Sequence, residues 1–130
     1  MKPQALLDHL DQGRLWSAPS GLSLEAAYAQ ALAVRQLRIE RGEQPRGYKV
    51  GFTNRAIWSR YNVFAPIWGS VWDSTLTLCE GEGSVSLSRT CQPRLEPEVV
   101  FGLKSTPAPD ATLDDLFAAL DWVAPGFEVV

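Results

Sequence analysis

Apolar residues recur at helical spacing in the first part of the chain and again near its end. The pattern predicts a short helix over residues 2–11 and a longer helix from Ser23, its N-cap, to Gly42. Asn54 is expected to cap a third, short helix. Thr112, which has an acid three residues later, is expected to cap a fourth.

Apolar and β-branched runs predict strands in the remainder of the chain. A hairpin is expected where two such runs flank the turn at residues 80–83. Residues 61–73 are rich in aromatic and turn residues, and we expect a loop that lines a cleft or, more commonly, fills the core. Ala124-Pro125-Gly126 is expected to end the fourth helix. The predicted strands cover residues 46–53, 74–79, 84–88, 93–103 and 126–130.

These elements together predict an α+β fold in one domain of residues 1–130. Residues 1–45 form a helical lead-in, and residues 46–130 form the β-rich part. A chain of 130 residues with 45% hydrophobic content is long enough for one core and too short for two.

Composition and charge exclude several classes of protein. The chain has 12 basic and 15 acidic residues, and the basic residues are scattered, which argues against a nucleic-acid partner. The N-terminal segment carries acids among its leucines, so it predicts neither a signal peptide nor a membrane span, and we expect a cytoplasmic protein. Cys79 and Cys91 do not form a zinc pattern and are expected to stay reduced, although the predicted hairpin leaves a disulfide possible. His9 is expected to be an ordinary surface or packing residue.

Two glutamates on one predicted strand are the first candidates for chemistry. The period of two places Glu96 and Glu98 on one face, about 7 Å apart, and Pro97 on the other face. Pro97 has no N–H, which favours an edge, a bulge or a strand start. Glu128 lies in the last predicted strand, so three carboxylates converge if the two strands are neighbours.

Convergent carboxylates repel one another, and a bound cation relieves that repulsion. Ligation by oxygen alone favours Mg²⁺ or Mn²⁺ over zinc. On spacing alone, a solvated face of an antiparallel sheet is the commoner explanation of a Glu-x-Glu strand. Lys49 is a further candidate because Gly47 and Gly51 flank it and leave room for a ligand, although a lone lysine on a strand is more often a solubilising residue.

Four motifs in order resemble the fumarylacetoacetate hydrolase superfamily. They are GYKVGFTN from Gly47, GSVWD ending at Asp73, RLEPEVVFGL from Arg94, and DWVAPGFEVV from Asp121. The greatest similarity is to the branch of 2-keto-4-pentenoate hydratases and 4-oxalocrotonate decarboxylases. Members are about twice this long, and their second half completes a mixed β-roll, so the resemblance implies the truncated N-terminal portion of such a fold.

The resemblance also implies a set of site residues. The Glu-x-Glu pair and the later glutamate of the family bind Mg²⁺ or Mn²⁺, which implies Glu96, Glu98 and Glu128 here. The family's active-site lysine in its GYKxG segment falls on Lys49, and the family's acid after the following glycine falls on Asp73.

The function that the resemblance implies is a metal-dependent hydratase in the catabolism of aromatic compounds. It would add water to 2-hydroxypenta-2,4-dienoate to give 4-hydroxy-2-oxopentanoate. The alternatives are decarboxylation of a 4-oxalocrotonate-type acid, carbon–carbon hydrolysis of an acylpyruvate, and a non-catalytic fragment or partner subunit. A homo-oligomer is expected, with a partner decarboxylase as a further possible associate.

Overall fold

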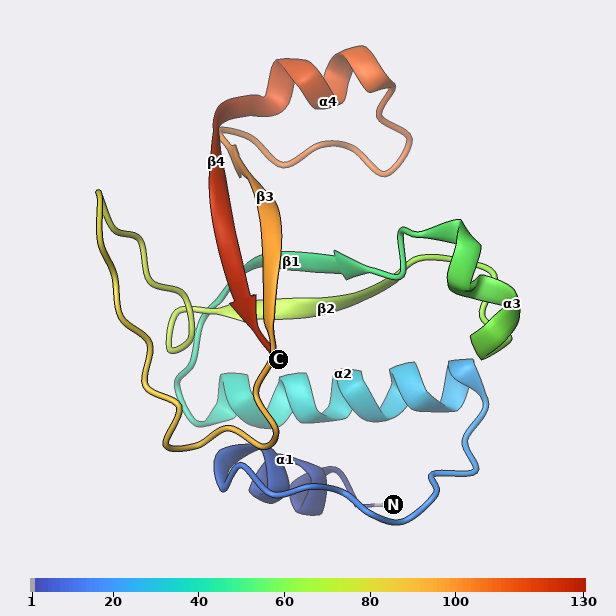
Figure 1. The fold of residues 1–130 in the computed structure, drawn as a ribbon. Coiled ribbons are helices and arrows are strands. Elements are labelled where there is room, and N and C mark those ends of the chain that lie inside the picture. The colour runs from blue at the N-terminus through green and yellow to red at the C-terminus, as the bar shows by residue number, and fades with distance from the viewer. Residues whose placement is uncertain (1) are drawn as a thin grey trace. The chain divides into compact units, whose positions relative to one another are not determined.

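The computed structural model describes residues 2–130, which fall into two compact units. The first unit reaches to Arg89, and the second runs from Thr90 to Val130. The elements, labelled in Figure 1, are α1 (Pro3–Asp11), α2 (Leu24–Glu40), β1 (Pro45–Gly51), a 3₁₀ turn (Arg55–Ile57), α3 (Trp58–Tyr61), β2 (Ile67–Trp72), β3 (Leu95–Leu103), α4 (Leu113–Ala119) and β4 (Leu120–Val129).

The predicted α+β character is confirmed. The described residues contain two antiparallel two-stranded sheets, β1–β2 in the first unit and β3–β4 in the second. Completion of a β-roll, and a single domain over residues 1–130, stay predictions. Among residues 2–130, no helix combines the length and the apolar character needed to cross a bilayer.

The caps of the predicted helices are also confirmed. Ser23 Oγ accepts a hydrogen bond from the backbone N–H of Ala26 at 3.2 Å, and Gly42 follows the end of α2 with a φ of 99°. At α4, Thr112 and Asp115 form a reciprocal capping box. The Thr112 hydroxyl and N–H both donate to the Asp115 carboxylate, and these hydrogen bonds lower its pKa.

Within the first unit, α2 lies between α1 and the β1–β2 sheet (Figure 1). The Tyr28 ring stacks on the Trp68 ring with centroids 5.3 Å apart. The Tyr28 hydroxyl accepts a hydrogen bond from the backbone N–H of Trp68 at 3.1 Å. Further along α2, the Arg38 guanidinium lies 4.4 Å from the centre of the buried Trp72 ring. The small core of this unit is formed around Leu7, Val34 and Trp72.

A network of charged groups joins the end of α2 to its surroundings. Glu43 accepts hydrogen bonds from Arg38 at 2.6 and 3.0 Å, from Arg41 at 2.5 Å and from the Ser74 hydroxyl. Arg41 also donates to Asp11, at the end of α1. Arg38 first, and then Arg41 and Ser74, lower the pKa of Glu43 to about 2 by hydrogen bonding to its ionised form.

Two of the predicted strand boundaries are wrong. Residues 67–72 form strand β2 rather than a loop, because they pair with β1 from Gly51↔Ile67 to Pro45↔Trp72. β1 in turn ends at Gly51. Phe52 adopts a φ of 58°, so its side chain does not continue the face of Tyr48 and Val50.

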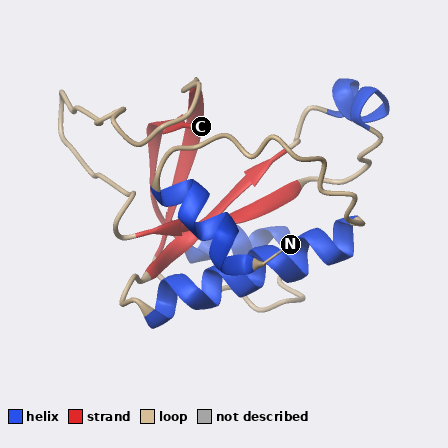
Figure 2. Ribbon diagram, turned by 90° about the horizontal axis from the view of Figure 1, so that it is seen from below, coloured by secondary structure: helices blue, strands red, loops and turns tan. Residues whose placement is uncertain are grey.

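The predicted hairpin of residues 74–88 is absent. No strand occurs between Trp72 and Leu95, and Figure 2 shows this segment as loop. The alternating apolar side chains there are exposed, with Leu78 at 73% and Val85 at 62% of their full accessible surface. Because neither face is buried, burial does not stabilise a strand in this segment. Cys79 and Cys91 are both exposed and free.

The expected break at Ala124-Pro125-Gly126 is also wrong. α4 ends at Ala119, and β4 continues through Pro125 to Val129. Arg94 and Val130 exchange backbone hydrogen bonds at 2.9 and 3.0 Å. Because bonded and non-bonded pairs alternate along an antiparallel ladder, the pairs Pro97↔Phe127 and Val99↔Pro125 fall at non-bonded positions. Each proline nitrogen therefore faces the open edge of its strand, and the ladder loses no hydrogen bond.

A close contact fixes the other end of the second sheet. Gly102 is buried opposite Trp122, and a Cβ on Gly102 would lie 2.0 Å from Trp122 Cε2. The indole therefore lies directly over the glycine backbone. This position requires a residue without a side chain.

Glu43→Gln tests the charged network. We expect the variant to lose about 1–2 kcal/mol of unfolding free energy at pH 7, since it removes hydrogen bonds to a charged acceptor. The pKa of Glu43 is depressed from 4.5 to about 2 on folding, so its stabilisation is complete above about pH 4.5 and is lost as the pH falls towards 2. Urea unfolding at several pH values should therefore show the difference between native and variant shrinking below pH 4.5. A difference that does not change with pH would contradict the assignment.

Gly102→Ala tests the contact with Trp122. We expect a loss of about 1–3 kcal/mol, because the indole must move to admit the methyl group. Gly47→Ala is the matched control, since a Cβ there meets no atom within 4 Å. Thermal unfolding of both variants should show a large effect only for Gly102→Ala, and equal effects would contradict the assigned contact.

Candidate metal centre

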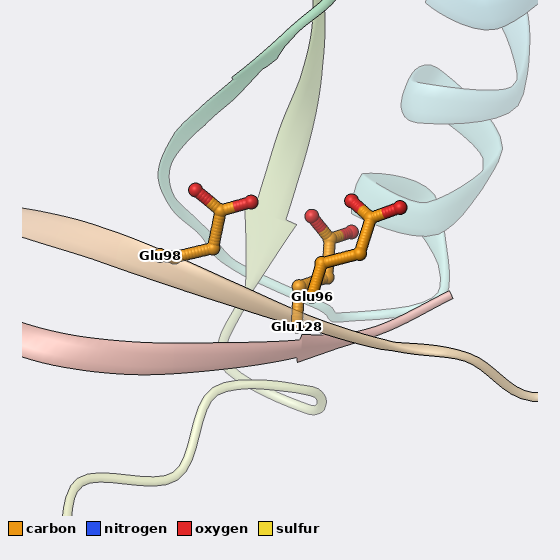
Figure 3. Close-up of side chains that lie close together, drawn as sticks. All are labelled: Glu96, Glu98 and Glu128. Carbon is orange, nitrogen blue, oxygen red and sulfur yellow. The ribbon is translucent and has the colours of Figure 1, made fainter.

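The β3–β4 pairing brings three glutamates together, as the sequence predicted. Glu96 lies directly opposite Glu128, and Glu98 follows two residues along β3 on the same face. Each offers a carboxylate oxygen, and these oxygens all lie within 4.8 Å of one another. Figure 3 shows the three side chains rising from the same side of the two strands.

Local sequence explains how the Val100 side chain packs over Gly126, beside the glutamates. Directly opposite Glu98 is Gly126, which contributes no side chain to the face. A Cβ on Gly126 would lie 2.6 Å from Val100 Cγ2 and 4.0 Å from Glu98 Cβ. Glu96 is exposed and Glu128 is half-buried, so the carboxylates combine access to solvent with partial shielding. We call this surface of the hairpin, with Glu96, Glu98, Gly126 and Glu128, the carboxylate face.

The donor set fits a hard divalent cation. Oxygens bound at about 2.1 Å in an octahedron lie about 3 Å apart when adjacent and about 4.2 Å apart when opposite. The oxygens of the three glutamates, all within 4.8 Å of one another, lie near these spacings. Three carboxylates without nitrogen or sulfur match Mg²⁺, Mn²⁺ or Ca²⁺ better than zinc.

Lys49 lies in the first unit, on β1. As predicted, it shares its face with Gly47 and Gly51, and its partner on β2 is a third glycine, Gly69. A Cβ on Gly69 would lie 3.4 Å from Lys49 Cε, so the lysine stem crosses the strand where a side chain is missing. The glycines hold space around this lysine on both strands.

Asp73 also lies in the first unit, just after β2. Its Oδ1 accepts hydrogen bonds from the backbone N–H groups of Gln44 and Ser74, both at 2.9 Å. The Asp73 N–H in turn donates to the Gln44 carbonyl at 3.0 Å. Asp73 therefore closes the β1–β2 ladder at the end beyond Trp72, whereas Lys49 pairs with Gly69, four residues earlier along the chain. The sheet does not place Lys49 and Asp73 opposite each other.

Three of the five predicted site residues thus form one cluster, and the other two lie at separate positions on β1–β2. Sequence reasoning missed the glycines that make room, Gly69 and Gly126. The predicted strand begins at Gly126, and the spacing of two residues to Glu128 is the signal that both lie on one strand face.

Comparison with known proteins gives related sequences of known activity. No family model matches the chain. A 2-hydroxyhexa-2,4-dienoate hydratase of Comamonas testosteroni is 36% identical over 110 residues, which are 84% of this chain and 42% of the relative. A 4-oxalocrotonate decarboxylase of a Pseudomonas species is 37% identical over 106 residues, 82% of this chain and 40% of the relative. The chain is a relative of this branch of hydratases and decarboxylases.

Solved structures agree with this relationship. A 4-oxalocrotonate decarboxylase from Pseudomonas putida G7, complexed with magnesium and adipate, matches with a TM-score of 0.79 at 26% identity. The match covers 98% of this chain and 51% of the decarboxylase. The same enzyme complexed with calcium and acetate matches with a TM-score of 0.77. The chain therefore spans about half the length of the hydratases and decarboxylases that it resembles.

Glu96→Gln tests the electrostatics of the carboxylate face. Like charges directly opposite on neighbouring strands destabilise a sheet, so in EDTA and low salt we expect the variant to gain about 0.5 kcal/mol. The gain should shrink in 1 M salt, which screens the repulsion. Thermal unfolding measures both effects, with Glu82→Gln in the loop as the control. An equal gain in the control would show that the three carboxylates do not repel one another specifically.

Proposed function

We propose that this chain provides the metal-binding carboxylates of a divalent-metal-dependent hydratase. The substrate is 2-hydroxypenta-2,4-dienoate, or a close analogue, and the product is 4-hydroxy-2-oxopentanoate. The observation that carries the proposal is the convergence of Glu96, Glu98 and Glu128 within 4.8 Å, in a relative of hydratases and decarboxylases. Figure 3 shows the three carboxylates that would hold the cation.

The cation is proposed to be Mg²⁺ or Mn²⁺. The solved decarboxylase that this chain resembles was complexed with magnesium in one crystal and with calcium in another, which supports a hard divalent ion. When bound, such an ion supplies a Lewis acid that withdraws electrons from the 2-oxygen and carboxylate of a 2-oxo acid. Three carboxylate ligands leave about three of six positions for substrate oxygens and water. The adipate in the decarboxylase is itself a dicarboxylate, in keeping with an acid substrate.

The roles proposed for the chain's own residues follow from the family resemblance. Glu96, Glu98 and Glu128 would hold the ion. Lys49 Nζ is proposed to carry the proton that moves when the dienol becomes a ketone, or to pair with the substrate carboxylate. Its stem lies across Gly69, which guides the direction of the amine.

Asp73 is proposed to orient another reacting group rather than to react itself. Its Oδ1 receives two backbone N–H groups, and its second oxygen would orient a water molecule. Because one carboxylate oxygen already holds the end of the sheet, its contribution to positioning is supported more strongly than a direct chemical step.

Decarboxylation of a 4-oxalocrotonate-type acid is the second candidate. The decarboxylase at 37% identity and the solved decarboxylase favour it as much as the hydratase at 36% identity favours hydration. Both reactions use the same electron withdrawal at C2. We prefer hydration because the GYKVGFTN segment and the leading helices resemble that group.

Calorimetric titration of Mn²⁺ into the chain tests the metal centre. Glu98→Gln should weaken Mn²⁺ binding on the order of 100-fold, because it replaces a charged ligand by a neutral amide. Oxalate, a planar mimic of the 2-oxo acid enolate, should strengthen binding to the native chain. Glu82→Gln, in the loop, is the matched control and should bind like the native chain. Equal Mn²⁺ affinity in Glu98→Gln would overturn the assigned site.

Substrate assays of the Mn²⁺-loaded chain separate the two reactions. Loss of dienoate absorbance without release of CO₂ supports hydration, whereas CO₂ release from 4-oxalocrotonate supports decarboxylation. Glu98→Gln should abolish whichever turnover is found. Tight Mn²⁺ binding without either turnover would contradict the enzymatic function and indicate a non-catalytic subunit.

A further inference from the structure

Beyond the three glutamates, the carboxylate face of the β3–β4 hairpin continues as a strip of apolar side chains. Val100 follows Glu98 by two residues on β3, so it lies on the same face, about 7 Å further along the strand. Its partner across the ladder is Ala124. The next pair on this face is Gly102 and Trp122, and the indole covers the glycine. We call Val100, Ala124 and Trp122 the apolar strip.

Val100 lies beside the glutamates. A Cβ on Gly126 would lie 2.6 Å from Val100 Cγ2 and 4.0 Å from Glu98 Cβ, so the valine methyl group fills the space that Gly126 leaves next to Glu98. Val100 and Ala124 are both half-buried. A ligand that is held by the carboxylates and extends along the hairpin in this direction therefore contacts apolar side chains at once.

The strip offers no positive charge to a ligand. The described residues that share this face, from Glu96 to Gly102 on β3 and from Trp122 to Glu128 on β4, include three glutamates and no lysine, arginine or histidine. A second carboxylate placed over Val100 would lose hydration without gaining an ionic partner, which is unfavourable. A hydrocarbon chain in the same place would be favourably removed from water. The strip therefore discriminates between an uncharged tail and a charged one.

A positive charge lies at the other end of the glutamate cluster. Arg94 and Val130 exchange backbone hydrogen bonds at 2.9 and 3.0 Å, which extends the pairing of the two strands beyond Leu95↔Val129. The alternation of side chains therefore places Arg94 on the carboxylate face, two residues before Glu96. None of the ion pairs among the described residues involves Arg94. Its guanidinium can thus serve as the partner of a ligand carboxylate.

The order of these groups along the hairpin matches the order of groups in a 2-oxo acid. Such an acid has a carboxylate at C1, a metal-binding oxygen at C2 and a carbon chain from C3 onwards. The face presents, in the same order, Arg94, the three glutamates that would hold the ion, and the apolar pair Val100 and Ala124.

We propose that the carboxylate face selects 2-oxo acids, and the corresponding 2-hydroxydienoates, whose tail is uncharged, and that it directs this tail over Val100 and Ala124. The inference rests on the proposed function, because the metal centre anchors the head of the substrate. A 4-oxalocrotonate-type acid carries a second carboxylate at its far end, so the strip separates the two candidate reactions by the charge of the tail.

Two acids of equal length test the selection by calorimetric titration of the Mn²⁺-loaded chain. 2-Oxopentanoate ends in a methyl group and 2-oxoglutarate ends in a carboxylate, whereas oxalate provides the metal-binding head alone. We expect 2-oxopentanoate to bind on the order of tenfold more tightly than 2-oxoglutarate, because only the second acid places a charge on the strip. Oxalate binding reports the metal centre without a tail, and none of these measurements requires turnover.

Val100→Lys should reverse the preference, because its ammonium group would pair with the tail carboxylate of 2-oxoglutarate. Val99→Lys is the matched control. It places the same charge on the opposite face of the same strand, where Val99 is 63% exposed, and it should keep the native preference. Val100→Thr keeps the β-branched shape and is used if circular dichroism shows that Val100→Lys does not fold. It should weaken 2-oxopentanoate binding about threefold and leave oxalate binding unchanged.

The outcomes separate this inference from the proposed function. Failure of both Mn²⁺ and oxalate to bind would overturn the two together. Oxalate binding with equal affinity for the two longer acids, or a preference that neither Val100 variant changes, would overturn the inference alone. An equal reversal by Val99→Lys would do the same, since net charge rather than the strip would then set the preference. A preference for 2-oxoglutarate that Arg94→Gln abolishes would show that the tail lies in the opposite direction, and it too would overturn the inference.

Discussion

The antiparallel pairing of β3 with β4 is the constraint on which the candidate site depends. Glu96 and Glu128 are 32 positions apart in the chain, yet the register places them directly opposite each other. A shift of one residue would move Glu128 to the other face of the sheet and disperse the cluster. The two prolines and the Gly102–Trp122 contact are compatible with one register, so the same features that shape the hairpin also assemble the carboxylates.

The alternation of side chains along β3 and β4 places the acidic residues and the exposed apolar residues on opposite faces of the hairpin. One face carries the three carboxylates together with Val100, Trp122 and two glycines, and the other carries apolar side chains. Alternation of this kind lets a short pair of strands gather the carboxylates on one side while the other side stays apolar.

The first unit is held together by contacts between α2 and its sheet. Its sheet is held to α2 by ring stacking and a cation–π contact, and the charged cluster around Glu43 connects the end of α2 to Asp11 and Ser74. These contacts place Lys49 on a sheet that is anchored at several points. Its three neighbouring glycines then provide room that side chains would otherwise occupy. The relationship to hydratases and decarboxylases gives this lysine and the three glutamates a common chemical context.

The sequence by itself determined the local features that depend on neighbouring residues. The caps at Ser23 and Thr112 were predictable because short-range hydrogen bonds create them, and the shared face of Glu96 and Glu98 follows from strand geometry. The motifs also identified the branch of enzymes.

The tertiary structure alone decided which extended segments find partners. The aromatic-rich segment that predicts a loop contains strand β2, whereas the alternating residues 74–88 form no strand. A strand is stabilised by pairing with its neighbour rather than by its own pattern. Pro125 is tolerated within β4 because of its place in the ladder, which no local pattern reveals. The convergence of Glu128 with the other glutamates likewise needed the register, since the pairing of distant strands is set by the sum of many contacts along both chains.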